Sequence, residues 1–186
     1  MAEAAYALYG AARLARYDPA GLGFFGDTAT DALRSFQAAI VALPVYALLL
    51  TIELSRAAVA APLLKVVLVE GVAYVAGWAA FPLVIYQIAD SIGRGDRVHR
   101  FIAAYNWTVV LQATALLVAA TIFSLHVLPD SVAMVLWLGV IVAVLAYQWF
   151  VARVGLALSA AGAAGIVAID LLISLTLNAI TTRMIL

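Results

Sequence analysis

The fold class follows from residues Val66 to Trp107, which read VVLVEGVAYVAGWAAFPLVIYQIADSIGRGDRVHRFIAAYNW. The run begins with one long apolar segment, continues through a short loop with three arginines, and ends with the start of a second apolar segment. About 20 apolar residues suffice for an α-helix to cross the hydrocarbon core of a bilayer. These residues therefore predict two membrane-spanning helices joined by a basic loop.

The composition of the whole chain agrees with a membrane protein. Hydrophobic residues make up 67% of the sequence and charged residues 11%, whereas about a quarter of the residues of a soluble domain are charged. The formal net charge is zero, so no overall field would attract nucleic acid and we expect no nucleic-acid partner. The absence of cysteine excludes disulfides, thiolate metal sites and cysteine nucleophiles. We predict an all-α, polytopic bundle in a lipid bilayer.

Apolar runs divide the chain into one short N-terminal segment and one membrane domain. Residues 1–32 form the N-terminal segment, and residues 33–186 hold about five spans. With 186 residues, the chain has no room for a sizeable soluble domain beside such a bundle. The predicted spans are about 33–50, 66–89, 102–125, 132–152 and 162–180.

The N-terminal segment predicts a helix outside the hydrocarbon core. The run from Ala2 to Tyr17 is rich in alanine and also carries tyrosine and arginine, which favours a short helix at the membrane surface. A solvated tail is the alternative. Pro19 and three glycines follow, and we expect Phe24 and Phe25 to anchor this segment in the interface.

The distribution of lysine and arginine predicts the orientation. Five spans place the two termini on opposite sides, and cytoplasmic loops carry the excess of positive residues. Three basic residues lie on the side of the C-terminus, and seven lie on the side of the N-terminus, which is therefore expected to be cytoplasmic, with the C-terminus periplasmic. The three are Arg56, Lys65 and Arg183; the seven are Arg13, Arg16, Arg34, Arg94, Arg97, Arg100 and Arg153.

A polar stripe interrupts the last span. Asp170 lies near its middle, followed at i+4 and i+8 by Ser174 and Asn178 on one helix face. A central aspartate costs about 2.5–3.5 kcal/mol on insertion. Thr108 and Gln112 share a face of the third span, and we hypothesise a hydrogen bond between Gln112 and Asp170. The stripe is either interhelical hydrogen bonding or a proton or cation path.

Glu70 is the second acid expected within the bundle. It lies about one turn into the second span, close to the outer interface and five residues from Lys65. We expect it to reach the interface or to pair locally with that lysine. Together with Asp170, it either forms a path for protons or cations or contributes hydrogen bonds between helices.

The arginine loop admits three readings. Arg94, Arg97 and Arg100 can set the topology, contact anionic lipid headgroups, or dock a protein partner. His99 and His126 are predicted on opposite sides, so they cannot share a metal. No metal-binding, phosphate-binding or nucleophile motif is present. We therefore expect no catalytic residue, no cofactor and no metal, and no enzymatic activity.

The layout resembles the membrane domain of the Yip family. The loop with Gly93 and Gly95 leads into Phe101 and Tyr105, a tight outer hairpin follows, and the fourth span has an aromatic end at Trp149 before the small-residue run from Ser159 to Gly165. The resemblance covers about residues 33–180. Eukaryotic members interact with Ypt and Rab GTPases, while bacterial members share the membrane domain and lack an assigned activity.

The resemblance implies a five-helix integral membrane protein with a cytoplasmic N-terminus. Eukaryotic members place a substantial cytosolic region before the bundle, and this region has no counterpart in residues 1–32. The resemblance therefore implies no GTPase-binding residue in this chain. Alanine richness and a preference for arginine over lysine suit a high-GC bacterium and its inner membrane. We expect an interaction or scaffold protein, or an accessory subunit, with a membrane-protein partner or a second copy. The alternatives are a small transporter or channel around Asp170 and a lipid-handling protein.

Overall fold

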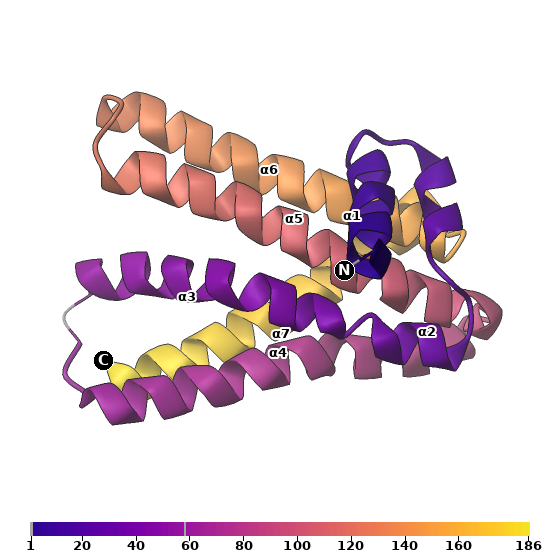
Figure 1. Ribbon diagram of the computed structural model, residues 1–186, viewed down its shortest axis with the longest axis horizontal. Helices are drawn as coiled ribbons and strands as arrows, with labels where there is room; N and C mark the ends of the chain where they lie inside the picture. Colours follow the sequence, from indigo (N-terminus) through magenta and orange to yellow (C-terminus); the bar gives the residue numbers. More distant parts are fainter. Residues whose placement is uncertain (1, 58) are drawn as a thin grey trace.

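The computed structural model describes residues 2–57 and 59–186, and every regular element in these two ranges is a helix. The predicted all-α fold is therefore confirmed (Figure 1). The elements are α1 (Ala2–Ala15), η1 (Pro19–Phe24), α2 (Ala29–Arg34), α3 (Gln37–Arg56), α4 (Leu63–Ser91), η2 (Gly95–Arg97), α5 (Val98–Ser124), α6 (Asp130–Gly155) and α7 (Ala160–Ile185).

Five helical segments of the described chain are long and apolar enough to cross a membrane. They contain 26 to 30 residues each, so they extend about 39 Å or more at 1.5 Å per residue. The hydrocarbon core is about 30 Å thick. Each segment is longer than the span predicted for it, and the segments are Ala29–Arg56, Leu63–Ser91, Gly95–Ser124, Asp130–Gly155 and Ala160–Ile185.

The first of these segments is interrupted. A continuous helix was expected from Leu33, but α2 ends at Arg34 and α3 begins at Gln37. The chain tightens between them, where the amide of Ala38 donates to the carbonyl of Ser35. Asn106 of α5 donates to the Ser35 hydroxyl at 2.8 Å, so a buried contact from a distant helix holds the break.

The five long helices form an open arc. Close packing joins α4 to α7, α7 to α6, α6 to α5, and α5 to α3, and α5 with α6 makes the expected tight hairpin. Helices α3 and α4 are consecutive in sequence, yet they stand at the two ends of the arc and meet mainly through side chains. This α3–α4 seam positions the cavity described below.

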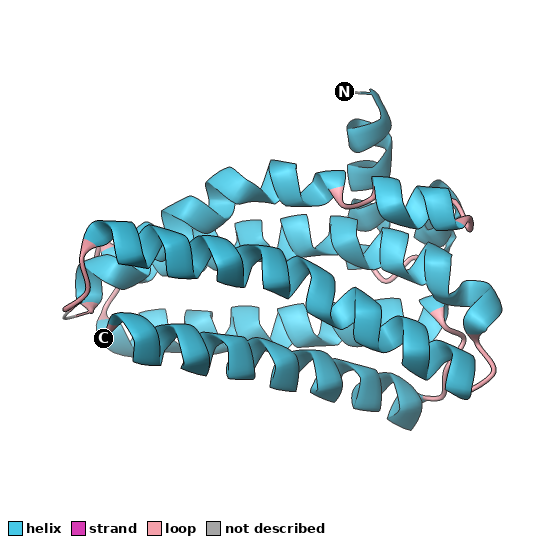
Figure 2. Ribbon diagram, turned by 90° about the horizontal axis from the view of Figure 1, so that it is seen from below, coloured by secondary structure: helices cyan, strands magenta, loops and turns pink. Residues whose placement is uncertain are grey.

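The two ends of the bundle differ in what they hold. Helix α1, the arginine loop around η2 and the α6–α7 turn gather at one end, while the α3–α4 connection, the α5–α6 turn and the C-terminus gather at the other (Figure 1). We call these the arginine-loop end and the C-terminal end. In both views α1 runs across the long axis of the bundle, which is the direction that an interfacial helix takes (Figure 2).

Helix α1 packs against the bundle through a narrow apolar face. Ala7, Ala11 and Leu14 are buried, and the hydroxyl of Tyr147 on α6 donates to the carbonyl of Ala11 at 2.7 Å. Phe25 is only 5% exposed and belongs to this core. The expected membrane anchor at Phe25 is therefore wrong, since the aromatic ring is used to dock the N-terminal segment.

Candidate functional site: a polar cavity within the bundle

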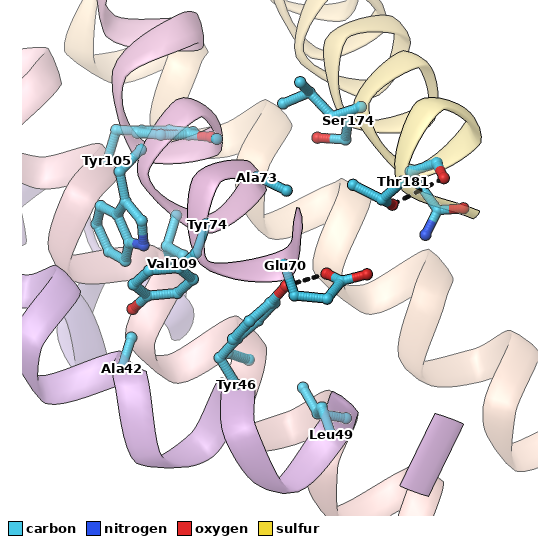
Figure 3. A pocket seen from close by; sticks show the side chains of 15 residues that line it. Ala42, Tyr46, Leu49, Glu70, Ala73, Tyr74, Tyr105, Val109, Ser174 and Thr181 are labelled. Atoms are coloured by element: carbon cyan, nitrogen blue, oxygen red, sulfur yellow. Dashed lines mark hydrogen bonds between the residues drawn. The ribbon is translucent and has the colours of Figure 1, made fainter. Parts of the chain in front are cut away.

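A cavity of about 330 Å³ opens at the α3–α4 seam (Figure 3). Its walls come from α3, α4, α5 and α7. Two tyrosines bridge the seam: the Tyr46 and Tyr74 ring centroids lie 4.6 Å apart, and the Tyr74 hydroxyl donates to the carbonyl of Ala39 at 2.6 Å. Because side chains rather than backbones close this seam, space remains behind them.

Glu70 is the acid of this cavity. Its side chain is buried, with 9% exposed, and its Oε2 accepts a hydrogen bond of 2.7 Å from the Tyr46 hydroxyl. The carboxylate points between α3 and α7 (Figure 3). The expected pairing with Lys65 is wrong: among the described residues Glu70 makes no ion pair, and its partner lies on another helix 24 positions away.

A second cavity, of about 270 Å³, continues toward the C-terminal end of the bundle. Glu53 of α3 lies at its wall, together with residues from the last turns of α7. None of the described residues that line either cavity is lysine, arginine or histidine. The two cavities share five lining residues, which are Tyr46, Leu49, Glu70, Asn178 and Thr181.

The polar stripe of α7 divides between the cavity and the packed core. Ser174, Asn178 and Thr181 line the cavity. Asp170 lies one turn closer to the arginine-loop end and is buried, with 8% exposed. The polar stripe predicted from spacing therefore lies partly at the cavity and partly in the packed core.

Asp170 joins three helices. The hydroxyl of Tyr105 on α5 donates to its two carboxylate oxygens at 3.0 and 3.1 Å, and Nε2 of Gln148 on α6 donates to Oδ2. The hypothesised Gln112 bond to Asp170 is wrong, because Nε2 of Gln112 is buried without a partner. Tyr105 precedes Gln112 by two turns on the same face, and the crossing of α5 and α7 places the tyrosine at the level of the acid.

The residues around Tyr105 close the cavity toward the arginine-loop end. The Tyr105 ring lies 4.5 Å from that of Phe81 and 6.1 Å from that of Phe101, and both phenylalanines are at most 2% exposed. Thr108, which is 1% exposed, donates to the carbonyl of Tyr105 at 2.7 Å. The cavity is therefore reached from the C-terminal end of the bundle, and a packed aromatic layer closes it toward the arginine-loop end.

The sequence did not single out Tyr46 and Trp78, which line the cavity, or Gln148, which donates to Asp170, as functional candidates. Gln148 had a detectable signal, because it is a lone amide in an apolar span. Tyr46 and Trp78 had none, since aromatic residues are common in such helices.

The arginine loop is fixed at one of its three arginines. Arg100 forms an ion pair of 2.8 Å with Asp27 of the N-terminal segment. Arg97 lies 3.9 Å from its neighbour Asp96 and is exposed, and Arg94 is partly exposed. Two guanidinium groups are therefore presented at this end of the bundle.

The described residues contain no group of three or more histidine, cysteine, aspartate or glutamate side chains that could hold a metal ion. What the cavity offers is one carboxylate, several hydroxyl and amide groups, and aromatic walls. Comparisons of the chain with protein-family models, with curated proteins and with solved structures find no match. The arrangement has the chemistry of a site that binds a cation or a proton.

Proposed function

We propose that the protein is a small transporter or channel of the bacterial inner membrane that passes a cation or protons through the cavity around Glu70. One observation carries the proposal: Glu70 is nine-tenths buried at a cavity wall to which no described basic residue contributes. A buried carboxylate without an ion-pair partner is costly. Binding a cation or a proton offsets that cost, so the site is suited to occupation by positive charge.

The two cavities supply one half of a path. In the proposed orientation the C-terminal end is periplasmic, and a cation entering there passes Glu53 before it reaches Glu70. The path ends at Tyr105, whose hydroxyl is held by Asp170. Passage to the cytoplasmic side then requires this contact to open, which gives Asp170 the role of a gate partner.

Flux through proteoliposomes tests the proposal. Purified protein is reconstituted into vesicles that contain either a pH-sensitive or a potassium-sensitive dye, and proton or potassium movement is followed after a gradient of that ion is applied. We expect flux in the parent protein and a loss of at least tenfold in Glu70→Gln. Asp130→Asn makes the same carboxylate-to-amide change at an exposed position outside both cavities and is expected to leave the flux unchanged.

Two results would contradict this function. One is a parent protein that is well folded in vesicles and conducts neither ion above empty vesicles. The other is an equal loss of flux in Glu70→Gln and Asp130→Asn. Because the chain contains no cysteine, single cysteines at Ser174 and Asn178 provide a further readout: water-soluble thiol reagents added from the C-terminal side are expected to label both.

The second candidate is an interaction or scaffold protein, or an accessory subunit with a membrane-protein partner or a second copy. The observation that favours it is the pair of guanidinium groups at this end, an exposed Arg97 and a partly exposed Arg94, on a loop that Arg100 fixes to the N-terminal segment. The Yip-like layout supports the same reading. Each arginine near anionic headgroups contributes about 1 kcal/mol, so the loop also suits anionic lipid.

Purification in mild detergent with mass spectrometry tests the second candidate. A stoichiometric protein partner lost in Arg94→Ala/Arg97→Ala supports interaction. Anionic lipid lost in the same variant supports lipid contact at the loop. Recovery of neither contradicts both roles for these arginines.

A further inference from the structure

We infer that the cavity binds an organic cation, an amine or quaternary ammonium ion, between Glu70 and the aromatic side chains of α3, α4 and α5. The inference rests on the proposed function and names its substrate class. It follows from three features of the cavity: the aromatic walls, the single acid, and the volume.

Four aromatic residues line the cavity, and three of them follow one another along α3 and α4. Tyr46 and Tyr74 lie 4.6 Å apart between centroids, and Tyr74 and Trp78 lie 6.1 Å apart. Tyr105 lines the same cavity from α5. The face of an aromatic ring attracts a cation, most strongly in tryptophan, and several rings around one space are the usual way in which proteins hold ammonium groups.

Glu70 supplies the charge. Its Oε2 accepts from Tyr46, and no described residue donates to its Oε1. The carboxylate is therefore held in place by one neutral donor and keeps an oxygen for a ligand. With no described lysine, arginine or histidine at the walls, the negative charge has no competing partner within the protein.

The volume fits an organic ion better than a bare metal ion. About 330 Å³ lies at the lower end of the roughly 300–1,000 Å³ of small-molecule pockets. Ca²⁺ takes six to eight oxygen ligands and Mg²⁺ a near-octahedral set of oxygen ligands, whereas this cavity has one carboxylate among mostly apolar and aromatic side chains.

Binding to the purified full chain in a nonionic detergent tests the inference. Benzyltrimethylammonium is titrated by calorimetry, and neopentylbenzene, in which carbon replaces the charged nitrogen, is the neutral isostere. We expect the cation to bind at least tenfold more tightly than the isostere. Equal affinity for the two in the parent protein overturns the inference without the need for any variant.

Variants assign the binding to this cavity. Glu70→Gln is expected to lower the affinity for the cation at least tenfold. Glu70→Asp, which keeps the charge, is expected to lower it less. Trp78→Leu is expected to weaken it about 5- to 30-fold, the range of a desolvated cation–π contact. Trp137→Leu removes an indole of α6 that does not line the cavity, and unchanged binding is expected. An equal effect of Trp78→Leu and Trp137→Leu contradicts the assignment.

The outcomes separate this inference from the function on which it rests. Proton or potassium flux that depends on Glu70, without binding of the organic cation, overturns the inference and leaves the transport function standing. If the cation binds but neither protons, potassium nor benzyltrimethylammonium crosses the vesicle membrane, transport is overturned and a binding site remains.

Discussion

Replacing Tyr105 by phenylalanine removes one hydroxyl from the contact at Asp170 and leaves the aromatic ring in place. The ring continues to pack on Phe81 at 4.5 Å, so no cavity is created and the change in stability reports the hydrogen bond. The hydroxyl lies 3.0 and 3.1 Å from the two carboxylate oxygens. Interhelical hydrogen bonds in membranes average about 0.6 kcal/mol, with a maximum near 1.7 kcal/mol.

We expect Tyr105→Phe to lower the free energy of unfolding by about 0.6–1.7 kcal/mol. A value in the upper half of this range is expected because the acceptor, Asp170, is buried and also accepts a hydrogen bond from Gln148. Reversible unfolding in mixed micelles, with increasing SDS in a mild detergent, measures the change. A double-mutant cycle with Asp170→Leu then isolates the coupling between the two side chains.

Tyr86→Phe is the matched control, because Tyr86 is 49% exposed on α4 and is expected to tolerate the loss of its hydroxyl. If Tyr105→Phe cost no more than Tyr86→Phe, the contact would contribute nothing to stability. A coupling below about 0.3 kcal/mol in the cycle, within the usual additivity error, would refute the reasoning in the same way.

Two further predictions concern Asp18 and Gln112. The Ala20 amide and the Arg13 guanidinium hold the pKa of Asp18 below its ordinary value, so the contact of α1 with η1 is expected at full strength above about pH 4 and to weaken as the pH falls below that. Hydrogen exchange of α1 measures this, and an equal acid response in Asp18→Asn would contradict it. Nε2 of Gln112 is buried without a partner, so Gln112→Leu is expected to be neutral or stabilising by up to about 1 kcal/mol. Unfolding in mixed micelles checks it against exposed Gln87→Leu, and a clear loss of stability would show that Nε2 has a partner.

The spans could be predicted because each is a local property of the sequence. An apolar run between polar turns determines a helix wherever its neighbours lie, and all five runs became helices. The break at Ser35 could not be predicted in this way. It is held by Asn106, which lies 71 positions away, and only the packed bundle brings the two together.

The candidate site shows the same division. Spacing placed Ser174 and Asn178 on one face of α7, and the structure puts both at the cavity. The partners of the acids depend on how the helices cross, which periodicity does not contain. Glu70 therefore forms its hydrogen bond with Tyr46, and Asp170 forms its hydrogen bonds with Tyr105 and Gln148 rather than with the expected Gln112.

The open arc of helices has a consequence for the order in which the protein assembles. As the chain enters the bilayer, α3 and α4 arrive first, but they do not pack closely on one another. Helix α3 gains its close packing from α5, and α4 gains part of its packing from α5 and most of it from α7, the last helix to be made. Helices that insert independently and associate afterwards permit such an order. A chain that stops after α4 would lack the helices on which α3 and α4 pack most closely, and Glu70 would lose the cavity walls that α5 and α7 provide.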